Sequence, residues 1–467
     1  MASDFSSLPL STELLQVVRE LGYDQLTPIQ AKSIPLLLAG KDLVGQSKTG
    51  SGKTAAFTLP ILQKINLNGK RLQALVLCPT RELCTQVARE VRKLGRRHPG
   101  LQVLILSGGQ PLFPQTTSLE KGVHIAVGTP GRILDHLNRK SLDLKDVDFL
   151  VLDEADRMLD MGFQEDMEKI LAAVPKSRQT LFFSATYPST IEAMSRSYQR
   201  NPVRVTIEDS AQSTPSIRQL VYETSPENKL KAILWLLQQH QPESAIIFCN
   251  FKASTIELAE ALSQAGVSTA CLHGDLEQSE RDRVMAKFRN LSTRVLIATD
   301  VAARGIDIEN LDVVFNFELP LKAEIYVHRI GRTGRAGKRG LAVSLVTPRE
   351  KSKLQGIEKY TNATLERKTL AAPEQLEVET AKKALHRDPK METLFISGGR
   401  KDKLRPGDIL GALTGEAGGL QGTEIGKIEI HDRFSYVAIS KSVAQVALQR
   451  LRDGKIKGRK FRIEPVR

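Results

Sequence analysis

The 467-residue chain carries 67 Lys and Arg against 53 Asp and Glu, a net charge of +14, with 41% hydrophobic and 26% charged residues. This composition is typical of a globular protein with ample core, and no apolar run approaches the ~20 residues that span a bilayer. The N-terminal stretch MASDFSSLPLSTELL lacks the basic and apolar regions of a secretory signal. We therefore expect a cytoplasmic protein without a membrane partner, with about three domains at roughly 150 residues each.

The positive charge has two interpretations. It can serve solubility alone, or it can indicate a polyanionic partner, because Lys and Arg that displace counterions from phosphates contribute much of the non-specific affinity for nucleic acids. Residues 389–467 contain 16 Lys and Arg and 9 Asp and Glu, which is half of the net charge. This concentration of charge at one end favours the second interpretation.

Continuous apolar runs mark the strands that we predict up to about residue 350. Such runs are typical of strands that are buried on both faces of a parallel sheet. Helical patterns lie between them: Leu83, Val87, Val91 and Leu94 recur at helical spacing, and Pro99 follows them. This alternation predicts doubly wound α/β domains. The runs are QALVLCPT, VLILSG, VHIAVGTP, DFLVLDEAD and QTLFFSAT, then SAIIFCN, TRVLIATD, DVVFNFELP and GLAVSLVTP.

Two polar stretches divide the chain into three predicted domains. The first, around residues 210–216, contains Pro215, and the second covers residues 370–388. We therefore expect α/β domains at 1–209 and 210–369. The tail, residues 389–467, has the pattern strand, helix, strand, strand, helix, strand, which predicts a small α+β domain with a four-stranded antiparallel sheet.

The four cysteines lack the spacing of a metal site. Cys78, Cys84, Cys249 and Cys271 lie in or beside apolar or helical patterns, without C-x-x-C spacing. We expect buried, reduced thiols and no cysteine-bound metal.

A phosphate-binding loop is predicted at residues 47–54. Its letters, SKTGSGKT, follow the apolar DLV and precede a helical run. The N–H groups of such a loop wrap phosphates, its Lys (Lys53) reaches the β- and γ-phosphates and its Thr (Thr54) holds Mg²⁺. Ser47 stands where the strict pattern has its first Gly. A chance turn rich in Gly, Ser and Lys is the alternative, but it does not account for G-S-G-K-T between a strand and a helix.

The stretch FLVLDEAD supplies the acidic half of the same site. Asp153 ends an apolar run and Glu154 follows it. A nucleoside triphosphatase needs one carboxylate for Mg²⁺ and a group that activates water. An acidic helix cap would explain this motif alone, but it would not explain why two matching halves of one site occur together.

These motifs resemble those of the DEAD-box RNA helicases, whose signature letters stand at residues 153–156. The resemblance covers almost the whole chain and implies two tandem RecA-like domains with doubly wound parallel sheets. The tail segments RPGDILGALTG, GKIEI and DGKIKG resemble the DbpA subgroup, which has a C-terminal RNA-recognition module (RRM-like). The motifs follow in family order: GYDQLTPIQ (22–30), SKTGSGKT, PTREL (79–83), GG (108–109), TPGR (129–132), SAT (184–186), HGDLEQSER (273–281), ATDVAARGID (298–307) and HRIGRTGR (328–335).

The resemblance implies which residues bind ATP and Mg²⁺. Tyr23 would stack on adenine, and Gln30 would hydrogen-bond its edge. Asp153 would hold Mg²⁺ together with the loop threonine, and Glu154 would orient and deprotonate the attacking water. The implied nucleotide-binding set is Tyr23, Gln30, Ser47, Thr49, Gly50, Ser51, Gly52, Lys53, Thr54 and Asp307, the last of which would meet the ribose.

The resemblance also implies an RNA path. Ser184 and Thr186 would connect the acidic motif to RNA binding. The family positions that contact the RNA backbone are Arg81, Gly109, Thr129, Arg132, Arg281 and Thr299.

The aromatic and basic residues of the tail that could contact RNA each have two interpretations. Phe434 and Tyr436 either stack on bases or pack in the core or at its rim, because Asp432 and Arg433 depart from the usual module pattern before them. The basic residues are either RNA contacts or a solvated face. They are Arg400, Lys403, Lys455, Lys457 and Lys460.

The stretch HRIGRTGRAG contains three arginines and no acidic residue, so its guanidinium groups require an anion from elsewhere. The resemblance implies that Arg332 and Arg335 reach the γ-phosphate of ATP held by the first domain. Such arginines stabilise transition-state charge and are worth ~10³–10⁵ in rate. A basic surface loop tied to acidic helices is the alternative. Because ATP and RNA would both favour closed domains, RNA should stimulate hydrolysis.

Two other functions are alternatives to an RNA helicase. An ATP-gated RNA clamp without catalysis is disfavoured by Glu154, Arg332 and Arg335, and a DNA helicase is disfavoured by the motif set and the tail. We expect a monomeric ATP-dependent RNA helicase with ATP and Mg²⁺ as cofactors and no DNA partner. Its tail would direct it to a hairpin of 23S ribosomal RNA during assembly of the large (50S) ribosomal subunit.

Overall fold

The computed structural model describes residues 4–47, 50–207, 217–303, 308, 310–334, 339–370, 389–415 and 419–466. The chain forms two compact units, the first within residues 1–213 and the second within residues 214–467. None of the helices in the described ranges has both the length and the apolar character that crossing a bilayer requires.

The first unit is built on a seven-stranded sheet in the order β3-β4-β2-β5-β6-β1-β7, in which every pairing is parallel. Its strands β2, β4, β5 and β6 are buried along their whole length because helices cover both faces. The strands are β1 (Leu43–Gln46), β2 (Ala74–Leu77), β3 (Val103–Leu106), β4 (Ile125–Gly128), β5 (Phe149–Asp153), β6 (Gln179–Ser184) and β7 (Val203–Thr206).

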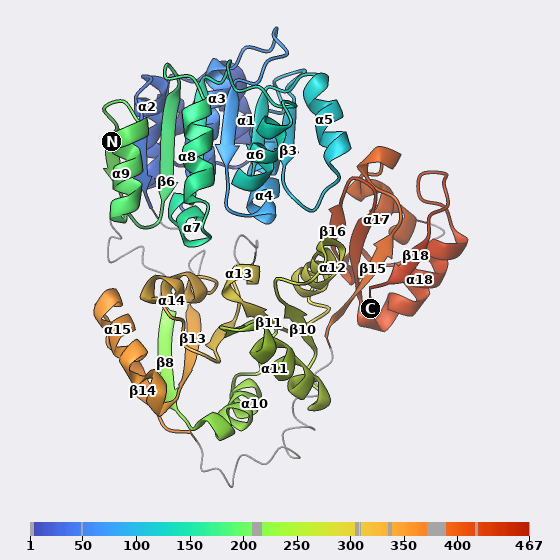
Figure 1. Cartoon of the computed structure of the whole chain (residues 1–467). Coiled ribbons are helices and arrows are strands. Elements are labelled where there is room, and N and C mark those ends of the chain that lie inside the picture. Colours follow the sequence, from blue (N-terminus) through green and yellow to red (C-terminus); the bar gives the residue numbers. More distant parts are fainter. Residues whose placement is uncertain are drawn as a thin grey trace. The chain divides into compact units, whose positions relative to one another are not determined.

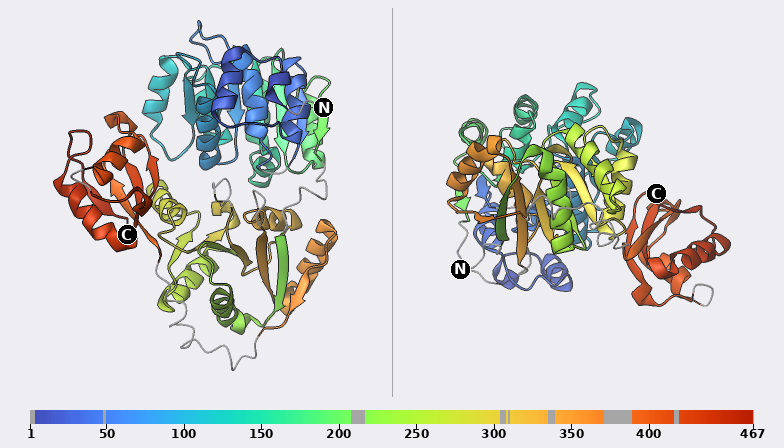
Figure 2. Two further views of the ribbon diagram at one scale, coloured as in Figure 1. Left: turned by 180° about the vertical axis from the view of Figure 1, so that it is seen from behind. Right: turned by 90° about the horizontal axis from the view of Figure 1, so that it is seen from below.

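Helices on both sides of this sheet make two cores. Figure 1 shows α6, α8 and α9 on one face, and the helices of the blue N-terminal residues cover the other face in the left view of Figure 2. The helices are α1 (Thr12–Glu20), α2 (Pro28–Leu38), α3 (Lys53–Lys64), α4 (Arg81–Leu94), α5 (Leu112–Glu120), α6 (Pro130–Asn138), α7 (Ala155–Asp160), α8 (Gln164–Ala173) and α9 (Ser189–Tyr198).

The second unit begins with another seven-stranded parallel sheet, in the order β10-β11-β9-β12-β13-β8-β14. Its strands are β8 (Ile217–Glu223), β9 (Ala245–Cys249), β10 (Thr269–Leu272), β11 (Val295–Thr299), β12 (Val313–Asn316), β13 (Gly340–Val346) and β14 (Glu366–Lys368). Its helices are α10 (Lys229–His240), α11 (Lys252–Gln264), α12 (Gln278–Arg289), α13 (Asp300–Ala303), α14 (Ala323–Ile330) and α15 (Lys351–Thr361).

The tail completes the second unit with an antiparallel sheet in the order β16-β17-β15-β18. Both of its helices pack on one face, where Leu394, Val437 and Ile439 meet Ile409 and Leu451. The elements are β15 (Met391–Ile396), α17 (Pro406–Thr414), β16 (Ile425–Ile430), β17 (Ser435–Ser440), α18 (Ala444–Asp453) and β18 (Ile463–Pro465). The two parallel sheets and the small antiparallel sheet confirm the predicted fold class.

The structure differs from the sequence predictions at the sheet edges and at one cysteine. Strands β7, β10 and β14 lie at edges and β8 lies beside one, and the apolar runs did not reveal these four. Cys78, Cys84 and Cys249 are buried as expected, but Cys271 is only partly buried. The prediction was wrong for Cys271 because β10 is an edge strand, which has a neighbour on one side only.

Candidate nucleotide and RNA sites

The order of the strands brings three motifs of the first unit to one edge of its sheet. Strand β6 lies between β1 and β5, and all three strands are parallel, so their carboxyl ends meet. The phosphate loop follows β1, the acidic motif begins at the last residue of β5, and the SAT motif begins at Ser184, the last residue of β6. Ligands of open parallel sheets bind beyond this edge.

Two side-chain hydrogen bonds connect residues within the phosphate loop. The Lys53 ammonium group is buried and donates to the carbonyl oxygen of Ser47 at 2.9 Å, and the Ser47 and Ser51 hydroxyl groups are 2.9 Å apart. Gly52 caps α3 with a φ of 90°, a left-handed conformation that favours Gly. Lys53 and Thr54 follow as the first two residues of the helix, where N–H groups without helical partners attract phosphate.

Gln30 is bonded to the phosphate loop itself. Its side-chain oxygen accepts from the Thr27 N–H at 2.9 Å, and its amide nitrogen donates to the Gly52 carbonyl at 3.1 Å. A Cβ atom at Gly52 would lie 2.5 Å from that nitrogen, so only Gly allows this approach. The second N–H of the Gln30 amide leaves capacity for an adenine edge. Tyr23 packs against Phe5, and its hydroxyl donates to Glu90.

Asp153 has the environment of a cation ligand. It is 3% exposed, and within the part of the chain that the structure describes its Oδ1 has no hydrogen-bond partner. Burial raises the pKa of Asp153 to about 6, against the lowering effect of nearby Lys53. Buried carboxylates are normally paired or coordinate metals, and Mg²⁺ takes one or two carboxylates together with phosphates and water. Asp153 and Thr54 therefore fit a Mg²⁺ ion that arrives with ATP.

Glu154 is held in an unusual backbone conformation beside Asp153. Its φ and ψ are 54° and 51°, in the left-handed region, and it directly precedes α7. Arg157 donates to the Glu154 carboxylate at 2.8 Å, and both side chains are buried. A non-Gly residue in this region is strained, and such strain is common at functional sites. The i,i+3 spacing of the two residues is the sequence signal that could have predicted this ion pair.

Asp156, for which the motifs predicted no separate role, connects the acidic motif to the SAT motif by hydrogen bonds. Its carboxylate accepts from the backbone N–H of Ala185 at 3.2 Å, and from the N–H and the hydroxyl of Thr186, both at 2.9 Å. Its own N–H donates to the Ser184 hydroxyl at 3.3 Å, and the N–H of Ser47 donates to the Ser184 carbonyl at 3.0 Å. The SAT motif is thus hydrogen-bonded to both the acidic motif and the phosphate loop.

Four of the predicted RNA contacts gather at one place in the first unit. Gly109 has a φ of 71°, and a Cβ atom there would lie 1.7 Å from an Arg81 nitrogen, so the guanidinium group lies directly on the Gly. Arg132 donates to the carbonyl of Gln110, the next residue, at 3.1 Å. Thr129 precedes α6, which contains Arg132. Burial and the positive charge of Arg81 lower the pKa of Arg132, although nearby Asp135 opposes this effect. Arg81 and Arg132 thus place two positive charges at an exposed Gly loop, an arrangement that can bind the phosphates of an RNA backbone.

A buried histidine supports this loop from behind. His136 is fully buried, and its ring nitrogens contact the Ser141 hydroxyl at 2.8 Å and the Gln115 side-chain oxygen at 3.0 Å. Gln115 in turn donates to the carbonyl of Ser107 at 3.2 Å. Burial lowers the pKa of His136, so the ring stays neutral at physiological pH.

The arginines of the second unit do not share one role. Arg329 is 1% exposed, forms an ion pair with Asp300 at 2.6 Å, and also donates to Asn316, to Asn250 and to the carbonyl of Glu318. The anion that meets Arg329 is therefore a carboxylate from the ATDVAARGID motif, which lies outside the HRIGRTGRAG stretch. Arg332 is also buried, at 7% exposure.

Two further predicted RNA contacts lie together in the second unit. Arg281 on α12 donates to the carbonyl of Ala302 at 3.1 Å, and the N–H of Ala302 donates to the Thr299 hydroxyl at 3.4 Å. Three residues of the predicted site, Thr49, Asp307 and Arg335, lie outside the described residues.

The tail's sheet turns its aromatic face toward α12. Asn290 and Ser292, which follow this helix, contact the Thr393 hydroxyl at 3.2 and 2.6 Å. Tyr436 pairs across the sheet with Phe395 and is 2% exposed, so it packs and does not stand open for stacking on bases. Phe434 is partly buried, and its ring stacks on His431 with centroids 4.5 Å apart. RNA-recognition modules usually bind bases on this sheet face.

A partly buried ion pair joins the same two surfaces. Arg289, the last residue of α12, donates to Glu429 on β16 at 2.8 Å. Burial alone would raise the pKa of Glu429, but hydrogen bonding by His431 and the charges of Arg289 and Lys427 hold it well below its usual value. The carboxylate is therefore ionised at neutral pH and keeps the pair intact.

The structure brings the two basic clusters of the tail together. Lys457 donates to the carbonyl of Lys403 at 2.8 Å and forms an ion pair with Asp408 at 3.4 Å. Arg400 donates to the carbonyl of Ile430 at 3.1 Å and lies 3.5 Å from the Asp432 carboxylate. Lys455 and Lys460 are exposed in the turn that precedes β18.

Comparison with known proteins agrees with this arrangement. Residues 27–194 match the DEAD/DEAH box helicase family, residues 228–337 the helicase conserved C-terminal domain, and residues 393–465 the DbpA RNA binding domain. The chain is 48% identical over 446 residues to the ATP-dependent RNA helicase DbpA of Escherichia coli (strain K12), a match that covers 96% of this chain and 95% of that protein.

Two further relatives cover the helicase domains. The DEAD-box ATP-dependent RNA helicase CshA of Bacillus cereus (strain ATCC 10987 / NRS 248) is 47% identical over 363 residues, which is 78% of this chain and 69% of CshA. The structure of S. cerevisiae Dbp5 bound to RNA and ADP BeF3 is similar with a TM-score of 0.71 and 32% identity, covering 82% of this chain and 100% of that one. The chain therefore belongs to the DEAD-box ATP-dependent RNA helicases, as a DbpA-like member with a DbpA RNA-binding domain.

Proposed function

We propose that this helicase remodels ribosomal RNA during assembly of the large ribosomal subunit, and that its tail directs it to a hairpin of 23S ribosomal RNA. The observation that carries this proposal is the tail itself, which matches the DbpA RNA binding domain over residues 393–465 and folds as a separate sheet with adjoining basic clusters. Lys and Arg groups of this kind bind phosphates and position an RNA, while unpaired bases provide specificity.

In the proposed reaction, ATP enters the first domain with Mg²⁺. Asp153 and Thr54 would hold the metal, and Lys53 would bind the β- and γ-phosphates. Glu154 would orient the attacking water and take its proton, and the bound metal would supply charge neutralisation at the phosphates. Arg332 and Arg335 stabilise the charge that develops on the γ-phosphate. RNA bound at the loop of Arg81 and Gly109 favours the same conformation as ATP and so stimulates hydrolysis.

The hydrogen bonds of Asp156 suggest how RNA and ATP sites communicate. The SAT motif shares bonds with the phosphate loop through Ser184 and with the acidic motif through Asp156. A change in position at any one motif therefore moves the others. We propose that the enzyme acts as a monomer and opens short duplexes locally.

The test is ATPase stimulation by a panel of defined 23S ribosomal RNA fragments, with random RNA and DNA of the same length as references. One hairpin-containing fragment should stimulate at a much lower concentration than random RNA. A chain truncated after Leu370 should keep stimulation by random RNA and lose the preference. Equal stimulation by all fragments would refute the targeting, and equal stimulation by DNA would refute the RNA preference.

A further inference from the structure

Tyr23, the predicted contact of the adenine of ATP, is held by side chains of α4. Its hydroxyl donates to the Glu90 carboxylate, and the Lys93 ammonium group lies 5.3 Å from the centroid of its ring. Glu90 and Lys93 are themselves 3.8 Å apart. Burial, together with the hydrogen bond and the charge of Glu90, holds the pKa of Tyr23 well above its usual value, so the hydroxyl keeps its proton and donates. The ring remains partly exposed and can also contact a base.

Helix α4 is a firm support for this ring. Thr80 caps its first turn by accepting from the Leu83 N–H at 3.2 Å, and one face of the helix is buried in the core from Leu83 to Leu94. Tyr23 itself lies before α2, on a stretch that forms neither helix nor strand. The hydrogen bond to Glu90 therefore gives the ring an order that its own backbone does not supply.

We propose that Glu90, together with Lys93, is a positioning residue for the nucleotide base, because it fixes the ring of Tyr23 before ATP binds. A base that stacks on a ring already held in place does not have to order that ring, and such preorganisation increases affinity. Neither residue lies in the motifs that define the ATP site. The inference goes beyond the proposed function: it rests on the predicted stacking of Tyr23 on adenine and does not depend on targeting by the tail.

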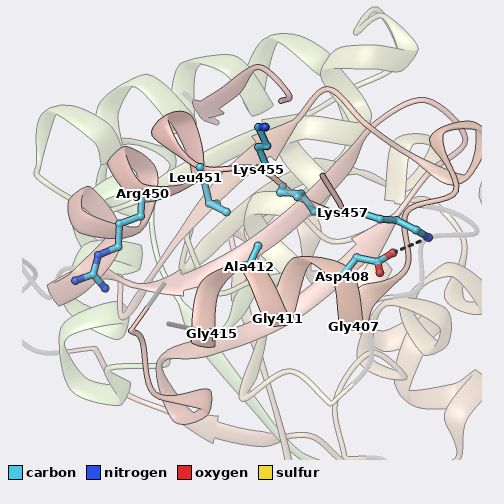
Figure 3. A pocket seen from close by; sticks show the side chains of 11 residues that line it. Gly407, Asp408, Gly411, Ala412, Gly415, Arg450, Leu451, Lys455 and Lys457 are labelled. Carbon is cyan, nitrogen blue, oxygen red and sulfur yellow. Dashed lines mark hydrogen bonds and ion pairs between the residues drawn. The ribbon is translucent and has the colours of Figure 1, made fainter. Parts of the chain in front are cut away.

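A groove in the tail provides a contrasting place for a nucleotide. It lies between α17 and α18, and its volume of about 410 Å³ is within the roughly 300–1,000 Å³ of small-molecule sites (Figure 3). A Cβ atom at Gly411, which lines this groove, would meet nothing within 4 Å. Gly411→Leu would therefore fill the groove. If the base of ATP binds at Tyr23, this substitution should leave the KM for ATP unchanged.

The test measures ATP hydrolysis by the full-length enzyme with saturating random RNA. Glu90→Leu removes the acceptor and should raise the KM for ATP about two- to tenfold, the range that ordering one side chain covers, with kcat unchanged. Inorganic tripolyphosphate has the phosphates of ATP but no base, so its inhibition constant should stay at the wild-type value. Glu90→Gln keeps an acceptor oxygen and should restore most of the affinity.

A double-mutant cycle shows whether the effect passes through the tyrosine. Tyr23→Phe removes the donor of the same hydrogen bond and should raise the KM as much as Glu90→Leu does. The double variant should show no further increase, because the two changes break one interaction. Glu192→Leu is the matched control, since Glu192 also lies on a helix of the first domain and pairs with Arg196 at 2.6 Å. It should leave the KM unchanged.

The outcomes that overturn the inference differ from those that concern the proposed function. A wild-type KM for Glu90→Leu, an equal rise in the tripolyphosphate constant, additive effects in the double variant, or a raised KM for Gly411→Leu would each refute it. Should Glu90→Leu lower the unfolding midpoint, Tyr23→Phe decides alone, and a wild-type KM overturns the inference. An unchanged KM for Tyr23→Ala would remove the stacking on which the inference rests and leave the proposed function standing. Loss of the hairpin preference would refute the targeting without changing these constants.

Discussion

Replacing Asp153 by Asn should stabilise the first domain in the absence of nucleotide. Burial raises the pKa of this carboxyl from 3.8 to about 6. One pKa unit equals about 1.36 kcal/mol, so the negative charge at Asp153 costs the folded state about 3 kcal/mol above pH 6. Asn keeps the shape of the side chain and removes the charge, and so it should recover most of that free energy.

The sign of the effect fixes its pH dependence. Because the folded state binds the Asp153 proton more tightly than the unfolded state, the stability of the wild type falls as pH rises from about 4 to about 6. The Asp153→Asn variant should not lose stability in this pH range, because its amide does not ionise. The difference in stability between the two proteins should therefore be largest above pH 6 and vanish near pH 4.

Thermal unfolding at several pH values measures the difference. For a domain of this size, 1 kcal/mol shifts the Tm by about 2–4 °C, so an increase of roughly 6–12 °C at pH 8 is the upper limit. ATP with Mg²⁺ should then raise the Tm of the wild type and have little further effect on the variant, because the metal ligand is gone.

Asp42 provides the matched control. It is buried in the same domain, but its carboxylate accepts from the N–H groups of Thr180 at 2.9 Å and Arg200 at 2.7 Å. Asp42→Asn should lower stability by ~1–3 kcal/mol, since the amide has only one acceptor oxygen and its NH₂ group would face one of the two N–H donors. An Asp153→Asn protein less stable than the wild type at pH 8 would show that Asp153 is a structural carboxylate like Asp42.

Three other substitutions test separate parts of the enzyme. Glu154→Gln should lower ATP hydrolysis by ~10²–10⁴-fold with little change in ATP binding, as steady-state kinetics and nucleotide titration will show; wild-type turnover would exclude Glu154 as the base. Arg335→Ala should lower kcat by at least about 10³-fold and leave ATP affinity without RNA nearly unchanged; a collapse of that affinity would make Arg335 a ground-state ligand. Arg329→Leu should destabilise the second unit by ~3–5 kcal/mol in urea unfolding, because it leaves Asp300 unpaired; normal stability with lost activity would contradict its structural role.

The sequence was most informative about the buried strands. Runs such as FLVL and LFF are apolar without alternation because both faces of their strands meet helices, and these runs predicted β5 and β6. The edge strand β3 gave a similar signal, VLIL, but the edge strands β7, β10 and β14 gave none. Strand β14, for example, is Glu366–Lys368, with three exposed side chains that need no apolar character.

The motifs predicted which residues would gather at the sheet edge, but not their bonding partners. Asp300 begins α13 and Arg329 lies in α14, and the fold brings these two helices close enough for the ion pair. No local spacing in the sequence relates the two residues. The hydrogen bond from Gln30 to Gly52 likewise depends on how α2 packs beside α3. Partners distant in sequence require the fold itself, and motif spacing does not contain that information.

The contact between the tail's sheet and α12 restricts how this enzyme can be recombined with others. Thr393 and Glu429 have partners in residues 289–292, so the tail is not an interchangeable attachment. A tail transplanted onto a helicase with a different α12 would leave Glu429 without Arg289 and would expose the ring of Tyr436. Functional chimeras of this helicase should therefore exchange residues 278–292 together with the tail, because the two surfaces are joined by an ion pair and hydrogen bonds.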